Sequence, residues 1–205
     1  MKKRIKVSEL KRMIRENSGK KVTREELKQM IKNGEDVTNV DVSGITDMSY
    51  LFYKEVDFNQ DISKWDVSNV EDMSGMFSNA TSFNQDISKW NVSKVRDMSY
   101  MFSDAESFNQ NISRWNTRNV VNMISMFDGA SSFNQPIGIW NTSRVQRMRD
   151  IFKDASSFDQ DLSRWSVGNV RDYKDVDFSG CPIRDEYLPE FIPSGSPKAR
   201  KFKYR

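Results

Sequence analysis

The chain has 205 residues, of which 37% are hydrophobic and 30% are charged, and its net charge is +3. This composition is typical of one folded domain, or at most two small ones, and no apolar run is long enough to span a membrane. The absence of histidine excludes Ser-His and Cys-His catalytic pairs and imidazole metal sites, and the single cysteine, Cys181, excludes an internal disulfide or a cysteine zinc site.

Residues 1–34 carry a net charge of +8 and are predicted to form a basic helical cap made of two short helices. The second helix begins with a capping-box pattern, Thr23 followed by Glu26, and Asn33-Gly34 is a natural stop. Apolar residues form a stripe at helical spacing in each helix: Val7, Leu10, Met13 and Ile14, then Val22, Leu27, Met30 and Ile31.

The basic charge of this segment has two interpretations. It is either a cap whose lysines are solvated, or a surface that binds nucleic acid or an acidic partner. No apolar stretch of the length that a secretory signal needs follows the first residues, and no cysteine lies near them for lipid attachment. We therefore expect an intracellular location.

A 25-residue repeat runs through the middle of the chain. One unit, from Phe58 to Ser82, reads FNQDISKWDVSNVEDMSGMFSNATS. Residues 33–57 form a degenerate first unit, and the fifth full unit, which begins at Phe158, also decays, as expected for terminal repeats. A fixed short period over most of a chain indicates a stacked array. All five tryptophans follow this period and are expected in the core: Trp65, Trp90, Trp115, Trp140 and Trp165.

Each unit has two halves with different periodicity. In residues 68–80 the apolar residues fall at helical spacing, with Ser68 or Asn69 as the N-cap. Residues 83–90 suit a short strand with one inward face. We therefore predict an α/β repeat solenoid of LRR-like, right-handed coils, with a parallel β-sheet on one flank and short helical turns on the other.

The predicted organisation has three parts. After the cap, residues 35–182 form about six coils, which would stack into a rod on the order of 30 Å long. Residues 183–205 form a C-terminal cap and a basic arm. Amide and hydroxyl side chains that recur in every coil are expected to form hydrogen-bond ladders along the rod.

The repeated motif FNQDISKWDVSNVxDMSxMFxxAxS resembles the BspA-like leucine-rich-repeat family, in the short 25-residue form of mycoplasma lipoproteins. The resemblance covers roughly residues 22–191. It implies an LRR-like solenoid with a role in adhesion or protein–protein binding at cell surfaces, and it supplies no catalytic residue.

Binding is expected where an exposed position departs from the repeat. Apolar residues replace polar ones in a candidate contact patch: Val121, Ile124, Pro136 and Ile139, with Tyr100 added as a neighbouring aromatic residue. A second candidate is basic and falls in one helical half: Arg144, Arg147, Arg149 and Lys153. The alternatives are drift on an unselected surface for the first set and a solvated face for the second.

The last segment, IPSGSPKARKFKYR, is predicted to be a flexible basic arm. Its positive charges would bind phosphates or an acidic groove, or would simply keep the chain soluble. These charges are Lys198, Arg200, Lys201, Lys203 and Arg205.

We therefore expect a non-enzymatic protein–protein interaction module without a cofactor, as a monomer or as a component of a larger assembly. Its partner would be another protein. The alternative is an accessory or structural subunit of a nucleic-acid-containing assembly, such as a virion or ribonucleoprotein, held through the basic ends. Carboxylates that repeat in every coil and the lack of a phosphate-binding glycine loop argue against an enzyme.

Overall fold

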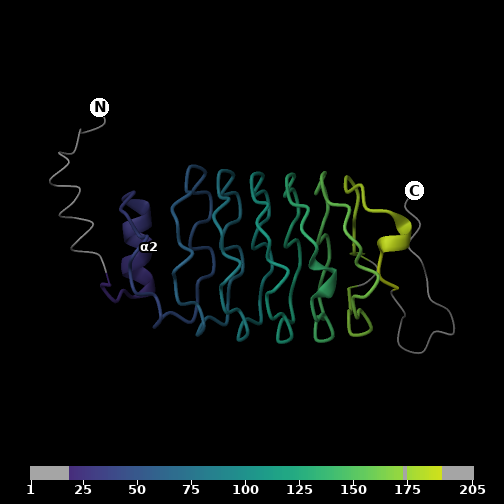
Figure 1. Ribbon diagram of the computed structural model, residues 1–205, viewed down its shortest axis with the longest axis horizontal. Helices are drawn as coiled ribbons and strands as arrows, with labels where there is room; N and C mark the ends of the chain where they lie inside the picture. Colours follow the sequence, from purple (N-terminus) through teal and green to yellow (C-terminus); the bar gives the residue numbers. More distant parts are fainter. Residues whose placement is uncertain (1–18, 173–174, 191–205) are drawn as a thin grey trace.

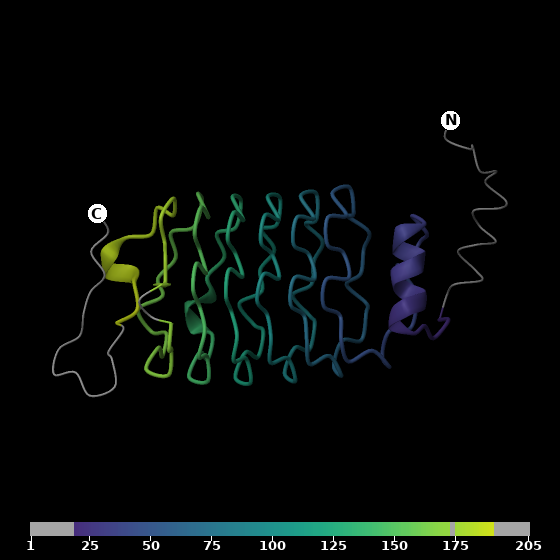
Figure 2. The same cartoon turned by 180° about the vertical axis from the view of Figure 1, so that it is seen from behind.

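The computed structural model describes residues 19–172 and 175–190, which form a row of stacked coils (Figure 1). Each coil corresponds to one 25-residue unit, and the coils follow one another in sequence order along the long axis, as the view from behind also shows (Figure 2). Within these described ranges the helical elements are the α-helix α2 (Arg24–Lys32) and the 3-10 turns η1 (Ile137–Ile139) and η3 (Asp185–Tyr187).

The predicted α/β fold class is wrong. Among the described residues, the coils have no β-sheet, and the predicted LRR-like parallel sheet is reduced to isolated one-residue parallel bridges. The predicted helix at residues 68–80 and the predicted strand at residues 83–90 are turns and irregular segments. One bridge column runs along the rod through Asp47, Asp72, Asp97, Asn122 and Arg147.

Two left-handed residues in each of the first five coils prevent the predicted helix. In the second coil these are Gly75, with φ of 58°, and Asn79, with φ of 59°. An α-helix requires negative φ at every residue. Alternate N–H groups instead point along the rod, so that Met73 donates to the Asp97 carbonyl of the next coil. Left-handed residues recur at the same two positions in other coils: Tyr50, Tyr100, Ser125 and Asp150, then Lys54, Asp104, Gly129 and Asp154.

The core is a continuous stack of aromatic rings. The predicted burial of the indoles is confirmed, since each tryptophan is 3–4% exposed. Each indole Nε1 donates to a carbonyl in the preceding coil, as Trp115 does to Ile87 at 3.1 Å. Phenylalanine rings stack from coil to coil in the same way, with 5.7 Å between the ring centroids of Phe77 and Phe102. Every coil therefore depends on its two neighbours for burial.

Amide side chains form the predicted ladder between coils. The backbone N–H of Asn109 donates to Asn84 Oδ1 at 3.0 Å, and Gln110 Nε2 donates to the same oxygen at 2.9 Å. The ladder ends at Asp159, whose Oδ1 is buried without a partner among the described residues, while Oδ2 pairs with Arg184 at 3.2 Å. An aspartate thus stands where the amide ladder stops.

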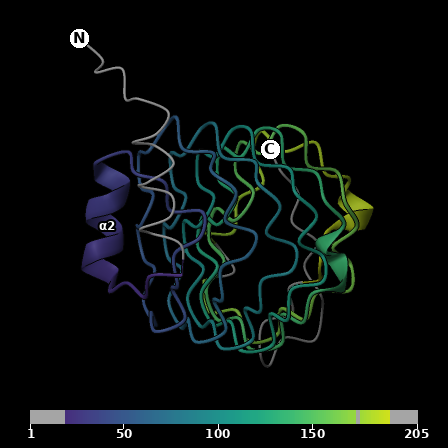
Figure 3. The same ribbon diagram turned by 60° about the vertical axis from the view of Figure 1, so that its left-hand side comes forward.

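Helix α2 covers part of the first coil (Figure 3). The capping box predicted from Thr23 and Glu26 is present, with reciprocal hydrogen bonds of 3.2 Å and 2.8 Å. The helix buries Leu27, Met30 and Ile31 in the core that it shares with the coils. The first predicted helix lies outside the described residues.

Aspartate side chains brace the turns of the coils. The Oδ1 atoms of Asp61, Asp66 and Asp86 accept the N–H of the serine two residues later, at 2.9–3.0 Å. Hydrogen bonds from these serines lower the pKa of each aspartate below its ordinary value of 3.8. Asp128 differs from these aspartates, because burial raises its pKa above the ordinary value.

Acid is therefore expected to destabilise the stack. The aspartates with lowered pKa contribute stability that is complete above pH 3.8 and is lost as the pH falls through their lowered values. Urea unfolding at a series of pH values checks this. Asparagine still accepts a serine N–H, as Asn91 does, so the triple variant Asp61→Asn, Asp66→Asn and Asp86→Asn should lose less stability in acid. If the triple variant lost as much stability in acid as the wild type, these three aspartates would not be the cause of the acid sensitivity.

Candidate functional site

Exposed apolar side chains gather on the first coil. Tyr50, Tyr53 and Val56 are 48%, 43% and 49% exposed. The rings of Tyr50 and Tyr53 meet edge to face at 5.8 Å. The equivalent residues of the second coil are small or polar: Gly75, Ser78 and Thr81. The first coil therefore presents a large apolar surface where its neighbour does not.

The ring of Tyr50 lies across Gly75, toward the third coil. A Cβ atom at Gly75 would lie 2.3 Å from Tyr50 Cε1, so the ring occupies the space that a side chain at residue 75 would take. Tyr100 occupies the same register position in the third coil and is partly exposed. We call Tyr50, Tyr53, Val56 and Tyr100 together the tyrosine surface.

Carboxylates accompany the tyrosine surface along the rod. Burial raises the pKa of the Tyr50 phenol, and the neighbouring Tyr100, Asp97 and Asp72 raise it further. The phenol therefore stays protonated near neutral pH and can donate a hydrogen bond. Residues 35–110, which contain this surface, carry a net charge of −9. The surface combines apolar contact area with negative charge.

The backbone edge of the first coil faces α2. In each of the next four coils, carbonyls at four alternate positions accept N–H groups of the preceding coil. The first coil offers the same four carbonyls, at Asp47, Ser49, Leu51 and Tyr53. Arg24 of α2 donates to two of them, Asp47 at 3.1 Å and Ser49 at 2.7 Å. The carbonyls of Leu51 and Tyr53 have no donor among the described residues.

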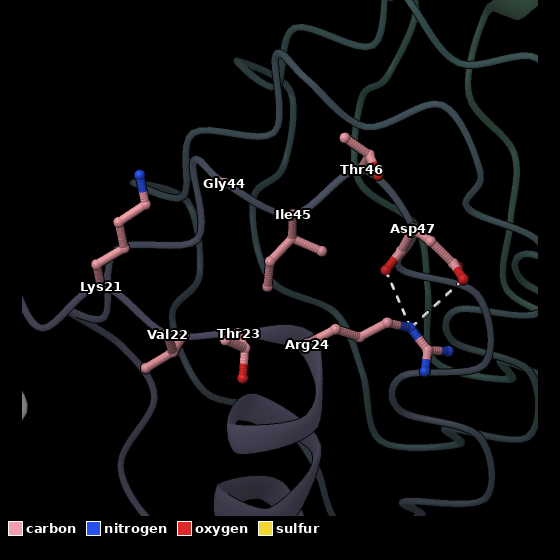
Figure 4. Close-up of a pocket in the computed structure, with 8 residues that line it drawn as sticks. All are labelled: Lys21, Val22, Thr23, Arg24, Gly44, Ile45, Thr46 and Asp47. Carbon is pink, nitrogen blue, oxygen red and sulfur yellow. Dashed lines mark hydrogen bonds and ion pairs between the residues drawn. The ribbon is translucent and has the colours of Figure 1, made fainter.

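A cavity of about 390 Å³ lies between α2 and the first coil. In Figure 4 the guanidinium of Arg24 reaches Asp47, whereas Lys21 extends away from this pair. Arg24 Nε lies 3.6 Å from Asp47 Oδ2, and Nη1 lies 3.3 Å from Glu25 Oε1. These polar groups hold the cap on the coil. The cavity is lined by Lys21, Val22, Thr23, Arg24, Gly44, Ile45, Thr46 and Asp47.

The structure separates the predicted apolar patch into two parts. Tyr100 and Ile124 lie in adjacent coils, joined by a backbone hydrogen bond of 2.8 Å, and Val121 is partly exposed three residues before Ile124. Pro136 and Ile139 are exposed at the turn η1. In the sequence this turn begins more than half of a 25-residue unit after Ile124. Ile139 is 69% exposed.

The predicted basic residues are exposed but engaged with neighbours. Arg144 donates to Asn119 Oδ1 at 2.8 Å, in a ladder in which asparagine and a cation alternate. Arg149 Nε lies 3.5 Å from Asp150 Oδ2. Arg147 ends the bridge column described above. The arm residues Lys198, Arg200, Lys201, Lys203 and Arg205 lie outside the described residues.

Sequence reasoning missed Tyr50, Tyr53 and Val56. A signal was present, since these residues align with a glycine, a serine and a threonine in the next unit. The sequence pattern alone predicts a degenerate terminal repeat for the first unit, in which such departures are typical of a cap. The carbonyls of Leu51 and Tyr53, which have no donor among the described residues, have no signal in the sequence because they depend on how coils pair.

Three further observations concern thiol chemistry, metal binding and membrane insertion. Burial raises the pKa of the Cys181 thiol to about 11, so little thiolate, the nucleophilic form, is present at neutral pH. In the part of the chain that the structure describes, no group of three or more acidic or cysteine side chains is arranged to hold a metal ion. No helix in that part has the length and apolarity needed to cross a bilayer.

The stacked coils define the chain as a repeat protein. Residues 21–123 and 92–182 match the family described as "Mycoplasma protein of unknown function, DUF285", and the chain belongs to that family. Neither the curated proteins nor the solved structures gave a match.

Proposed function

We propose that the chain is a non-enzymatic protein-interaction module, and that the tyrosine surface is its contact face. The observation that carries this proposal is the grouping of Tyr50, Tyr53 and Val56, each more than two-fifths exposed. Tyrosine is enriched in protein interfaces because its ring gives contact area and its hydroxyl gives a hydrogen bond.

The charge around the tyrosine surface favours a basic partner. Asp72 and Asp97 lie close enough to influence the Tyr50 phenol. A positive partner surface would meet them favourably, which raises association rates and disfavours acidic competitors. We therefore propose a protein partner that presents basic residues beside apolar ones.

The scaffold supports binding because it is pre-ordered. Tyr50 rests on Gly75, and the first coil is anchored by the aromatic stack on one side and by Arg24 on the other. A surface that is ordered before binding loses less conformational entropy when it binds.

We also propose that the chain is a BspA-like member of DUF285, on the strength of its repeated motif alone. This relationship concerns the repeat sequence and does not extend to a leucine-rich-repeat sheet. The alternative role in a nucleic-acid-containing assembly depends on the basic ends, most of whose residues lie outside the described part, and no observation on the described residues favours it.

Affinity capture with the full chain tests the proposal. The double variant Tyr50→Ser with Tyr53→Ser uses the residue found at the same register in Ser125 and Ser78, so it should fold. Arg114→Ser shortens an exposed side chain elsewhere on the rod, outside every candidate contact surface, and serves as the control. We expect a specific partner bound by wild type and by Arg114→Ser, with binding by the double variant weakened at least about tenfold. Unchanged capture by the double variant, or no specific partner for wild type, would refute the proposal.

A further inference from the structure

We infer that one flank of the rod pairs with the same flank of a second copy of this chain, in an antiparallel dimer with a two-fold axis. The inference rests on the proposed function, because it names a partner for the side of the tyrosine surface that Tyr50 and Tyr100 form. The flank follows the bridge column through the second to fifth coils. We call it the bridge face, and it is defined by Glu71, Asp72, Tyr100, Ile124, Arg147 and Arg149.

The charge of the bridge face changes sign along the rod. In the second coil Glu71 is exposed and Asp72 is partly exposed. In the fifth coil the same two register positions hold Gln146 and Arg147, and both Arg147 and Arg149 are exposed. The face is therefore acidic at one end and basic at the other.

Apolar side chains lie between the two charged ends. Tyr100 in the third coil and Ile124 in the fourth are both partly exposed, and the Tyr100 N–H donates to the Ile124 carbonyl at 2.8 Å. Val121 adds a partly exposed side chain in the fourth coil. The charges of Arg96 and Asp97 in the third coil cancel. An apolar centre flanked by charged residues is the arrangement found in protein interfaces.

The charged ends are placed symmetrically about this centre. The bridge column passes through Asp72, Asp97, Asn122 and Arg147, one residue from each of four successive coils. The coils lie in one row with a nearly constant spacing, since stacked phenylalanine centroids are 5.3–5.7 Å apart from the first coil to the fifth (Figure 1). Asp72 and Arg147 are therefore equally far from the midpoint between Asp97 and Asn122. A two-fold axis through that midpoint places Asp72 of each copy opposite Arg147 of the other.

The opposite orientation is disfavoured by charge. Two copies that run side by side in the same direction would place the Glu71-Asp72 pair against itself and Arg147 against itself, and like charges that face each other oppose association. In the antiparallel pair, the second copy presents Arg147 and Arg149 beside Val121 and Ile124. This combination of basic and apolar residues is the chemistry that the tyrosine surface favours.

Exchange of the charged pairs tests the arrangement. The acidic variant, Gln146→Glu with Arg147→Asp, copies the pair of the second coil onto the fifth. The basic variant, Glu71→Gln with Asp72→Arg, makes the reverse change. Each new residue already occurs at the same register position in another coil, so both variants should fold. Sedimentation equilibrium of the full chain, whose mass is 24.0 kDa, at concentrations up to about 1 mM measures the dimer.

We expect a monomer–dimer equilibrium for the wild type with a dissociation constant below about 0.1 mM. Either charge variant alone should raise this constant at least about tenfold, because acid then faces acid or base faces base. An equimolar mixture of the two variants should dimerise within about threefold of the wild type, since each acidic pair again meets a basic one.

Two further variants locate the contact. Ile124→Ser introduces the residue found at Ser74 and Ser99, and it should weaken the dimer at least about tenfold because the interface contains Ile124 twice. Arg114→Glu reverses an exposed charge outside the bridge face and should leave the dissociation constant unchanged.

Several results would overturn the inference. These are a mass that stays at the monomer value up to about 1 mM, charge variants that dimerise as well as the wild type, and a mixture that does not recover. A mass that grows beyond the dimer with concentration would also overturn it, since head-to-tail contacts do not close.

The two proposals fail in different ways. If the serine double variant loses its captured partner but the chain remains monomeric, the tyrosine surface binds a different protein and the dimer is wrong. If the dimer forms with the expected charge pattern but capture by the serine double variant is unchanged, the proposed function is wrong.

Discussion

Replacement of Phe102 by alanine is expected to lower the free energy of unfolding by about 3–5 kcal/mol. The Phe102 side chain is completely buried at the middle of the aromatic stack. Its ring centroid lies 5.7 Å from those of Phe77 and Phe127, and 4.0 Å from that of Phe108. The substitution removes contacts with the preceding and the following coil at once, and the stacked rings leave little freedom to fill the cavity.

Urea unfolding followed by tryptophan fluorescence measures this loss. Ile139→Ala removes an exposed apolar side chain from the same rod and should change the free energy of unfolding by less than about 0.5 kcal/mol. A loss at Phe102 that is no larger than the loss at Ile139 would show that the stack does not carry the stability of the rod.

The sequence period identified the interior but not the path of the backbone. Every tryptophan was correctly placed inside, because a core position repeats at the same step in each coil. The apolar spacing around Met73, Met76 and Phe77 predicts a helix, although tight four-residue turns produce the same spacing. Met76 donates to Met73 at 3.2 Å in such a turn, and the left-handed Gly75 lies between them. The φ angle of a residue such as Asn79 is not evident from apolar periodicity.

The candidate site was harder to predict than the core. Departures from the repeat at Val121 and Ile139 were visible because full units flank them. Those at Tyr50 and Tyr53 lie in the first unit, where departures are also expected for a cap. Which backbone carbonyls accept a hydrogen bond from the preceding coil depends on how the coils pair, and the repeat pattern of the sequence does not show that.

The second large effect is expected at Gly138. Pro136 replaces the carboxylate or amide whose oxygen accepts the N–H two residues later in neighbouring coils, as Asn111 Oδ1 accepts from Ser113 at 3.1 Å. The turn forms η1 instead, with Ile137 donating to Gln135 at 2.8 Å. In this turn a Cβ atom at Gly138 would lie 2.0 Å from the carbonyl oxygen of Asp161 in the next coil.

Gly138→Ala should therefore lower the free energy of unfolding by about 1–3 kcal/mol, because a backbone oxygen cannot move aside as a flexible side chain can. Gly168→Ala is the matched control, since nothing lies within 4 Å of its added Cβ and its φ angle is not left-handed. Urea unfolding of both variants distinguishes the contact from a general cost of replacing glycine. If Gly138→Ala is as stable as Gly168→Ala, the close approach of η1 to the next coil is not a feature of the folded chain. If it is less stable by the expected amount, the glycine at this break in the repeat is explained by packing, and the exposed Ile139 beside it is a consequence of the same turn.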